Sequence, residues 1–330
     1  MRLFVCEFIT CGGMRDKVLP DLLRFDAEIM LQALMADLRK LPGIDIISTR
    51  DDRLDDLPES VADITEQDDV WDIWGKCMQD ADAIWAIAPE SQGLLLKMHD
   101  LAIESACDFI GCSAEAINIT ASKFTTARHL LKNGIACIET FHVGGRIPHS
   151  STGWVVKPDD GAGTDACYFF KDKMQLQNWQ QQRSAQQLFV IQRYVPGLAA
   201  SLSVLYHNEQ VQLLACNEQL VRFHDGIGRN HGVVVNGLRH KYQSFESIAK
   251  EIGRAIPGLS GYVGIDLLVT ASGPVVVEIN PRLTTSYAGL SESLDTNVAE
   301  LVLQTINTNE LSTLPDRSPA VVTVDMYAGQ

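Results

Sequence analysis

The sequence lacks a long hydrophobic run. No stretch approaches the ~18 apolar residues that a membrane-spanning helix needs, so we expect no membrane anchor. The apolar run within residues 1–17 is short, contains Glu7 and leads into two glycines. We therefore expect a buried first strand there instead of a secretion signal, and a cytoplasmic protein.

Positive charge and closely spaced cysteines are also scarce. The formal net charge is −15, which excludes a general binder of nucleic acid or anionic membranes. A nucleotide substrate stays open, because a few local cations are enough to bind phosphates. None of the eight cysteines forms a CxxC pair, which argues against a structural zinc site and favours reduced thiols.

What is present is the composition of a globular chain of 330 residues, with 46% hydrophobic and 21% charged residues. Up to about residue 113, apolar strand patterns alternate with helical patterns, which predicts a small open parallel sheet. We expect strands at 2–9, 44–49 and 82–88, helices at 21–40 and 94–106, and an acidic, turn-rich segment at 50–69.

From Gly153 onward, short strand patterns follow one another with turn residues between them. This succession of short strands and turns predicts a mostly antiparallel sheet. The expected strands are 154–158, 166–170, 188–195, 200–207, 210–217, 232–237, 261–269 and 274–280, with helices at 122–133, 245–254 and 297–305. We expect a mobile flap at 224–232 and an edge strand at 321–327.

The most informative segment is the hairpin GYVGIDLLVTASGPVVVEINP, residues 261–281. Folding it about residues 270–273 places Asp266 opposite Glu278 with Cβ atoms about 5 Å apart, and Asn280 on the same face. Two facing carboxylates repel each other unless a cation lies between them, and carboxylate and amide oxygens suit Mg²⁺. The alternative is an acidic pair on a solvated face.

Three basic residues and a glycine loop accompany the hairpin. Lys123 begins the helix at 122–133, where both the ammonium group and the helix N-terminus favour anions. Lys157 lies on an apolar strand, and the loop with Gly161, Gly163 and Thr164 can offer backbone N–H groups to phosphates, although such loops are often plain turns. Arg282 is either a surface cation or a ligand for an anionic substrate oxygen.

In this order the segments resemble the ATP-grasp superfamily over residues 115–305. The motifs are SKFTTARHLLKNGI, VVKPDDGAGT, VIQRYVPG and the hairpin ending in VVVEINPR. The resemblance implies an α/β and α+β protein with the ATP-grasp fold. It implies an N-terminal α/β pre-ATP-grasp domain at 1–113, two lobes that clasp ATP at 114–196 and 197–310, and a tail or edge strand at 311–330.

The resemblance also implies roles for individual residues. Lys123 and Lys157 would contact the phosphates of ATP, and Asp266, Glu278 and Asn280 would hold Mg²⁺, with Mn²⁺ as the alternative ion. Arg282 and Lys157 would act in catalysis. The residues that would border adenine are Gln192, Tyr194 and Val195. This chain has Gln192 where many members have glutamate, and it lacks the acidic ribose ligand after the hinge glycine, where Ser201 is the candidate substitute.

The opening CEFITCGG is similar to that of ATP-grasp proteins related to tyramine–L-glutamate ligase, although a glycine turn after a first strand is also a general α/β feature. This likeness implies a carboxylate–amine ligase that acts through an acyl phosphate in methanofuran-type cofactor biosynthesis. Its partners would be a small carboxylate and a small amine, with a homodimer as one open oligomeric state. Two alternatives remain: a small-molecule kinase on the same fold and a nucleotide-binding protein without turnover.

Overall fold

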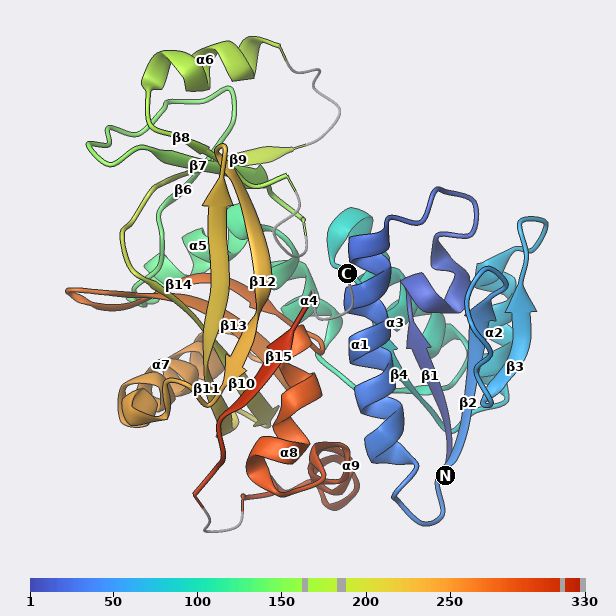
Figure 1. Ribbon diagram of the computed structural model, residues 1–330. Coiled ribbons are helices and arrows are strands. Elements are labelled where there is room, and N and C mark those ends of the chain that lie inside the picture. The colour runs from blue at the N-terminus through green and yellow to red at the C-terminus, as the bar shows by residue number, and fades with distance from the viewer. Residues whose placement is uncertain (162–165, 183–187, 315–317, 327–330) are drawn as a thin grey trace.

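The computed structural model describes residues 1–161, 166–182, 188–314 and 318–326. The chain forms an N-terminal domain, a large C-terminal sheet with its helices, and a smaller group of strands under α6 (Figure 1). The predicted residues Gly163 and Thr164 lie outside the described part of the chain.

The N-terminal domain contains a parallel sheet in the order β3-β2-β1-β4-β5. Side chains of the central strand β1 alternate between two apolar clusters: Phe4 and Cys6 pack on one side, Leu3 and Val5 on the other. Helices therefore cover both faces, as expected for a parallel sheet. The elements are β1 (Arg2–Glu7), α1 (Asp21–Leu38), β2 (Asp45–Asp51), β3 (Ser60–Ile64), α2 (Val70–Gln79), β4 (Ala83–Ile87), α3 (Leu94–Glu104) and β5 (Asp108–Phe109), with short helical turns η1 (Ile9–Gly13) and η2 (Ser91–Gly93).

The expectation for residues 50–69 was wrong in part, because this segment contains β3. β3 is an outer strand that pairs only with β2, and its second and fourth residues are exposed. A half-exposed edge strand carries polar residues, which hid it in the sequence. The helix α2 was not predicted either, although Asp69 caps it by accepting hydrogen bonds from the N–H groups of Trp71 and Asp72.

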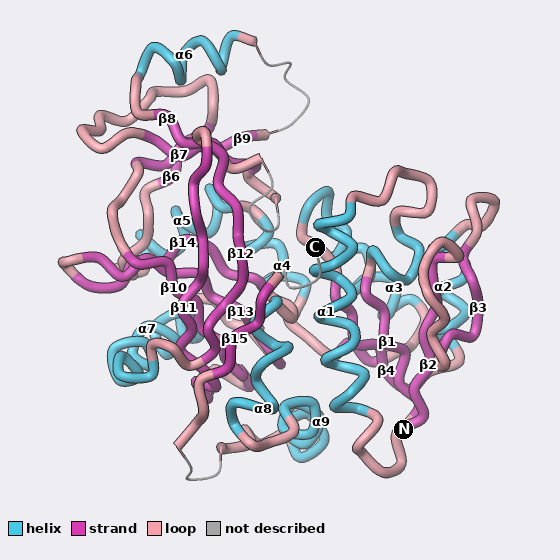
Figure 2. The backbone as a smooth tube through the Cα atoms, in the orientation of Figure 1, coloured by secondary structure: helices cyan, strands magenta, loops and turns pink. Residues whose placement is uncertain are grey.

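Helices α4 (Ala114–Ala121) and α5 (Lys123–Lys132) lead into a second sheet of ten strands. Its larger part runs β14-β13-β10-β11-β12, with β15 added to β12, and its smaller part runs β8-β7-β9-β6. In the described residues, β8 and β12 join the two parts where Tyr168 pairs with Ile227, and Figure 2 shows the smaller part above the long strands. The predicted antiparallel second half is confirmed.

The remaining elements have the following bounds. The strands are β6 (Thr140–His142), β7 (Trp154–Pro158), β8 (Tyr168–Phe170), β9 (Phe189–Arg193), β10 (Leu198–His207), β11 (Gln210–His224), β12 (Ile227–Val235), β13 (Gly261–Thr270), β14 (Gly273–Asn280) and β15 (Val322–Asp325). The helices are α6 (Lys173–Gln181), α7 (Tyr242–Ala255), α8 (Leu290–Leu294) and α9 (Val298–Thr308), with short turns η3 (Arg239–Lys241) and η4 (Thr285–Gly289).

The segment 224–232, predicted as a mobile flap, contains regular strand pairing. These residues belong to a β-hairpin in which β11 and β12 are joined by Asp225 and Gly226. Both turn residues have positive φ, 50° and 77°, as a tight two-residue hairpin turn requires. The edge strand expected near 321–327 is present as β15.

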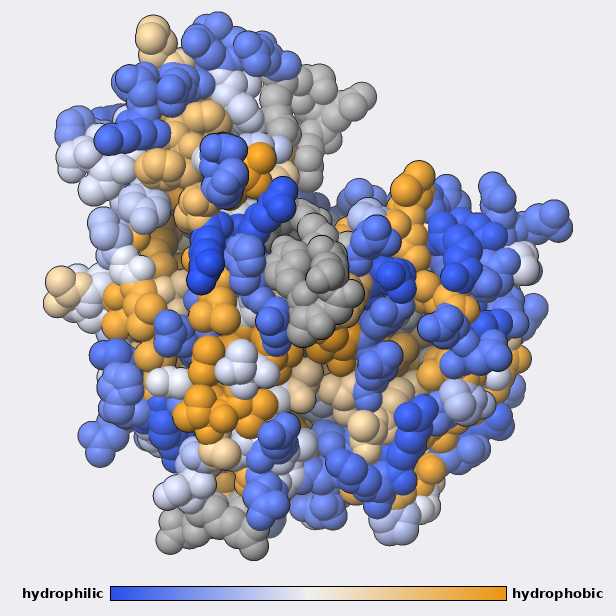
Figure 3. Space-filling model, in the orientation of Figure 1, coloured by the Kyte–Doolittle hydropathy of each residue, from blue (hydrophilic) through white to orange (hydrophobic). Residues whose placement is uncertain are grey.

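The surface view shows hydrophilic residues over the outer side of α6 and over much of the N-terminal domain (Figure 3). In α6 only Leu176 is fully buried, so one side of this helix packs and the rest faces solvent. None of the helices in the described ranges is long and apolar enough to cross a membrane.

Candidate active site

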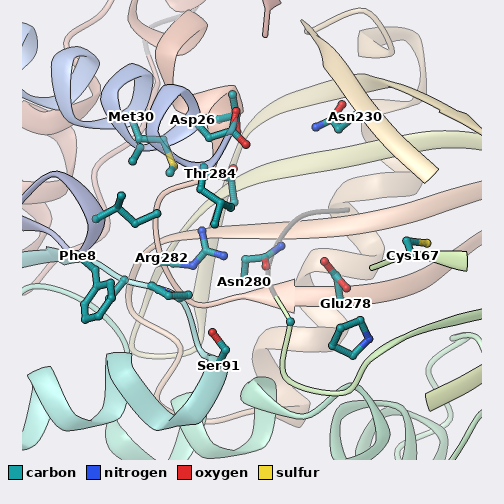
Figure 4. Close-up of a pocket in the computed structure, with 18 of the residues that line it drawn as sticks. Phe8, Asp26, Met30, Ser91, Cys167, Asn230, Glu278, Asn280, Arg282 and Thr284 are labelled. Atoms are coloured by element: carbon teal, nitrogen blue, oxygen red, sulfur yellow. The ribbon is translucent and has the colours of Figure 1, made fainter. Parts of the chain in front are cut away.

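A cavity of about 1380 Å³ lies where the N-terminal domain meets the two parts of the second sheet. It is lined by the turn after β1, the start of η2, the strands β7, β9 and β11, and the hairpin β13–β14. Figure 4 shows Glu278, Asn280 and Arg282 pointing into it, with Phe8 on one side and Cys167 on the other. The cavity therefore brings together residues from all three parts of the fold.

The hairpin has the predicted register. Asp266 pairs with Glu278, and Asn280 pairs with Gly264, which has no side chain to obstruct the amide. A bulge follows Asp266, so that Leu267 pairs with Val276. Asn280 Nδ2 lies 3.4 Å from Asp266 Oδ2, and the side chains of Glu278 and Asn280 are almost fully buried. Asp266 is partly buried and lines the cavity, so the acidic pair faces this cavity and not the outer surface.

The two predicted lysines converge on this hairpin. Lys157 Nζ lies 3.2 Å and Lys123 Nζ 3.3 Å from the same oxygen, Oε2 of Glu278. Lys123 also donates a hydrogen bond to the carbonyl oxygen of Gly161, where the glycine loop begins. Both ammonium groups are nearly buried, so each is held in place by its partners.

The position of Lys123 depends on Asp159, a residue that the sequence reasoning missed. Its carboxylate accepts hydrogen bonds from Ser122 Oγ (2.7 Å) and from the N–H of Phe124 (2.8 Å). Ser122 in turn caps α5 by accepting from the N–H of Thr125. A buried acid at the end of β7 therefore ties the start of α5 to the strand that carries Lys157. The Asp-Asp-Gly turn was the only signal of this residue.

The electrostatics of the carboxylate pair are unequal. Burial raises the pKa of Asp266, and repulsion from Glu278 raises it further. Burial also acts to raise the pKa of Glu278, but the two ammonium groups outweigh it and hold the pKa below its ordinary value. Without a further cation, the ionised form of Asp266 is disfavoured. Gln219, also missed in the sequence, donates to Asp266 Oδ1 at 2.8 Å.

These side chains fit a divalent cation of the Mg²⁺ type. Asp266, Glu278 and Asn280 offer hard oxygen atoms on one face of the hairpin, and Asp266 lacks a full countercharge there. Among the described residues no group of three His, Cys, Asp or Glu side chains is placed to hold a metal ion. The third oxygen donor of the proposed site is the amide of Asn280.

The three residues predicted to border adenine all line the cavity, but their side chains have different surroundings. Tyr194 and Val195 line the cavity, and the ring of Tyr194 contacts the rings of Phe169 and Phe223. Gln192 also lines it, but its amide donates to Thr140 Oγ1 at 2.9 Å and is buried.

Ser201, the predicted ribose ligand, lies on β10. It pairs with Asp266 in the register of β10 and β13, and its hydroxyl accepts from Asn217 at 3.4 Å. Ser201 therefore lies beside the carboxylate pair and also lines the cavity. Its contact with the ribose stays a prediction.

Arg282 is not a surface cation. Its Nε lies 3.0 Å from Oε1 of Glu90 and one of its Nη atoms lies 3.2 Å from Oε2, and both side chains are nearly buried. Glu90 follows β4 in the N-terminal domain and was not singled out in the sequence.

The opening segment CEFITCGG forms one wall of the cavity. The buried carboxylate of Glu7 accepts from the N–H and the hydroxyl of Thr10, and burial raises its pKa to about 8. Gly12 has φ +99°, and a Cβ there would lie 2.6 Å from the side chain of Ile64. A Cβ on Gly13 would lie 2.4 Å from the carbonyl oxygen of Phe8. Both glycines are therefore required for the turn that presents Phe8 to the cavity.

Comparisons with known proteins agree with this arrangement. The ATP-grasp domain family matches residues 120–286, and the pre ATP-grasp 3 domain family matches residues 44–117. The tyramine–L-glutamate ligase of Methanocaldococcus jannaschii is 28% identical over 233 residues, which cover 71% of this chain and 65% of that protein, so the match spans less than two thirds of that relative. The enzyme of the same name from Methanocaldococcus fervens is 25% identical over 276 residues, 84% of this chain and 79% of that protein.

Among solved structures, a protein of Archaeoglobus fulgidus described as belonging to the ATP-grasp superfamily aligns with a TM-score of 0.72 and 21% identity. The alignment covers 98% of this chain and 99% of that one. At this identity the likeness supports the fold alone. The predicted fold is confirmed, and the chain belongs to the ATP-grasp family, with a pre ATP-grasp domain ahead of its ATP-grasp domain.

Proposed function

We propose that the chain is an ATP-dependent carboxylate–amine ligase that acts through an acyl phosphate. The observation that carries the proposal is the convergence of Lys123 and Lys157 on Glu278, opposite Asp266, at one end of a cavity that continues to the N-terminal domain. One end suits phosphates, and the other leaves room for a second substrate. In this proposal the lobes at 114–196 and 197–310 close on ATP, and residues 1–113 supply the substrate side.

At the phosphate end, Asp266, Glu278 and Asn280 would hold Mg²⁺, which supplies charge neutralisation at the phosphate oxygens. The ammonium groups of Lys123 and Lys157 would bind the same phosphates. The loop from Gly161 through Gly163 and Thr164 would add backbone N–H groups. Tyr194 and Val195 would border adenine beside Gln192.

The chemistry requires two displacements. An oxygen of the substrate carboxylate attacks the γ-phosphorus of ATP, the bond to the β-phosphate oxygen breaks, and ADP leaves. The amine nitrogen then attacks the acyl carbon, phosphate leaves with the electron pair of the C–O bond, and the nitrogen loses a proton. Positioning and charge stabilisation do most of the catalysis in such transfers, and Arg282 would bind the anionic oxygens of the acyl phosphate.

The part of the cavity in the N-terminal domain favours an amine with an apolar body. Phe8, Met30 and Trp71 line it, and its polar lining residues include both acidic side chains, such as Asp26 and Asp69, and the basic Arg15 and Lys17. An apolar wall with carboxylates suits a protonated amine attached to a ring or chain. The two relatives are named for tyramine and glutamate, and this wall together with their 25–28% identity supports the same substrate pair and a role in methanofuran-type cofactor biosynthesis.

The test is ADP formation by the purified protein with Mg²⁺, ATP and a panel of amino acids and amines that begins with glutamate and tyramine. We expect ADP to form in proportion to an amide product detected by mass spectrometry. A stable phosphoester in place of the amide would indicate a kinase, and ATP binding without ADP would indicate a protein without turnover. Either result would overturn the ligase proposal.

A further inference from the structure

Residues 90–93 of the N-terminal domain contact both halves of the phosphate end of the site. Glu90 binds Arg282, two residues after Asn280 at the end of the hairpin. The N–H of Gln92 donates to Asp160 Oδ2 at 2.9 Å, and Asp160 directly precedes Gly161. One short segment therefore reaches the residues that directly follow β14 and the start of the glycine loop.

The contact between Glu90 and Arg282 fixes the orientation of the guanidinium group of Arg282. It is bidentate, with 3.0 and 3.2 Å separations, and the exposed fractions of the two side chains are 6% and 10%. A parallel pair of hydrogen bonds holds the plane of the guanidinium, and burial makes the loss of either partner costly for the other. A third bond, from Nη1 of Arg282 to the carbonyl oxygen of Leu283, completes the restraint.

The restrained guanidinium still has donors for a ligand. The three bonds use the Nε–H, one Nη1–H and one Nη2–H, out of the five N–H groups of arginine. Arg282 lines the cavity beside Asn280 (Figure 4). The two remaining N–H groups are therefore available to an anionic oxygen in the cavity, in a direction set by Glu90.

The backbone of the segment is held in an unusual conformation. Gln92 has φ 56° and the next residue, Gly93, has φ 70°. A non-glycine residue adopts this left-handed conformation only when its surroundings compensate for it. The hydrogen bond from the N–H of Gln92 to Asp160 is such a compensation, so this turn is held by its contact with the residues that follow β7.

We propose that Glu90 is a positioning residue of the ligase reaction. It holds the guanidinium of Arg282 at the acyl phosphate and so makes the reaction depend on contact between the N-terminal domain and the hairpin. The proposal rests on the function proposed above. Glu90 is not among the residues that line the cavity, so its loss should affect the chemical step more than the binding of ATP.

The first variant is Glu90→Gln, which keeps the size of the side chain but removes its charge. We expect kcat for ADP formation to fall about 10- to 100-fold, as for other residues that orient a catalytic group, while KM for ATP changes less than about 3-fold. Glu90→Asp keeps the charge and should recover part of kcat. If Glu90→Gln folds poorly by circular dichroism, the Glu90→Asp variant decides the question by the same split between kcat and KM.

The second arm is a double-mutant cycle with Arg282→Gln. When Glu90 acts only through Arg282, adding Glu90→Gln to the Arg282→Gln protein causes no further loss of kcat. The matched control is Glu59→Gln, which breaks another bidentate pair of the N-terminal domain, Arg39 with Glu59 at 2.6 and 2.7 Å, and should leave kcat unchanged.

The proposal is overturned if Glu90→Gln turns over like the wild type, if it raises KM for ATP as much as it lowers kcat, or if the two losses multiply in the double variant. A wild-type protein that never forms ADP contradicts the proposed function itself, and the role of Glu90 is rejected with it. The wild-type reaction therefore distinguishes the two failures.

Discussion

At the scale of single residues, Asp266 and Glu278 face each other but are not equivalent. Oε2 of Glu278 contacts two ammonium groups, whereas Asp266 accepts hydrogen bonds from the neutral amides of Gln219 and Asn280. A buried carboxylate pair that lacks a bound cation lowers the stability of the fold but provides a binding site for that cation. Unfolding experiments measure the effect on stability, and activity assays measure the effect on function.

The first prediction concerns Asp266→Asn in metal-free protein with a chelator. The pKa of Asp266 is raised in the folded state, because burial and Glu278 disfavour its charge. A raised carboxyl pKa contributes stability at low pH that is lost as pH rises above the ordinary aspartate value of about 4. The variant should therefore unfold about 2 °C higher than the wild type at pH 7, for a gain of about 1 kcal/mol, and in a separate assay with Mg²⁺ it should lose ADP formation.

The check is a pair of thermal unfolding curves at pH 4 and pH 7. The difference between variant and wild type should be larger at pH 7. An equal difference at both values would contradict the account of the carboxylate pair.

The second prediction concerns the removal of Lys123 and Lys157, which both contact Glu278. Lys123→Met or Lys157→Met removes one phosphate contact and leaves Glu278 with one ammonium, so each should raise the Kd for ATP by about 10-fold or more, near the worth of one charged hydrogen bond. The double variant leaves a buried carboxylate without a countercharge, which costs about 3–5 kcal/mol of folding stability.

Calorimetry measures the Kd values, and urea unfolding measures the stability. Lys250→Met, which breaks the solvent-exposed pair of Lys250 with Glu246, is the control and should change neither quantity appreciably. A double variant as stable as either single variant would show that the lysines are not the countercharge of Glu278.

At the scale of elements, the hairpin β13–β14 depends on a glycine opposite Asn280. A Cβ on Gly264 would lie 2.5 Å from the side chain of Thr284, so Gly264→Ala should destabilise the fold by about 1–3 kcal/mol through overcrowding. The matched control is Gly75→Ala in α2, where the nearest atom would be 3.6 Å away and the helix should gain up to about 1 kcal/mol. Urea unfolding of both variants should give opposite signs, and equal signs would contradict this packing.

Which elements could be predicted depended on the strength of local signals. The hairpin at 261–281 has two apolar strands around a glycine-ended turn, and its register, including the pairing of Asp266 with Glu278, followed from the sequence. The hairpin β11–β12 also carries a strong signal, Asp225-Gly226, but the polar residues around it suggested a loop. The edge strand β3 lacked an apolar pattern because two of its five residues are exposed and only Ile64 is buried.

At the scale of the whole molecule, the sequence indicated the phosphate end of the site better than the connection between domains. Lys123, Lys157 and the hairpin follow the order of a known family, so their convergence was expected. Glu90 and Arg282 are 192 residues apart, and Ser201 was assigned from its distance along the chain to the hinge. Pairing of β10 with β13 also places Ser201 opposite Asp266, which the sequence did not indicate, because strand register and not distance along the chain sets this neighbour.

The central claim is that the carboxylate hairpin and the two lysines bind ATP together with a divalent cation. The most direct measurement is calorimetric titration of ATP into the wild-type protein and the Asp266→Ala variant, each with Mg²⁺ and with a chelator. We expect tight binding only for wild type with Mg²⁺, and an affinity about 100-fold or more lower in the other three titrations. Equal ATP affinity in all four would contradict the claim.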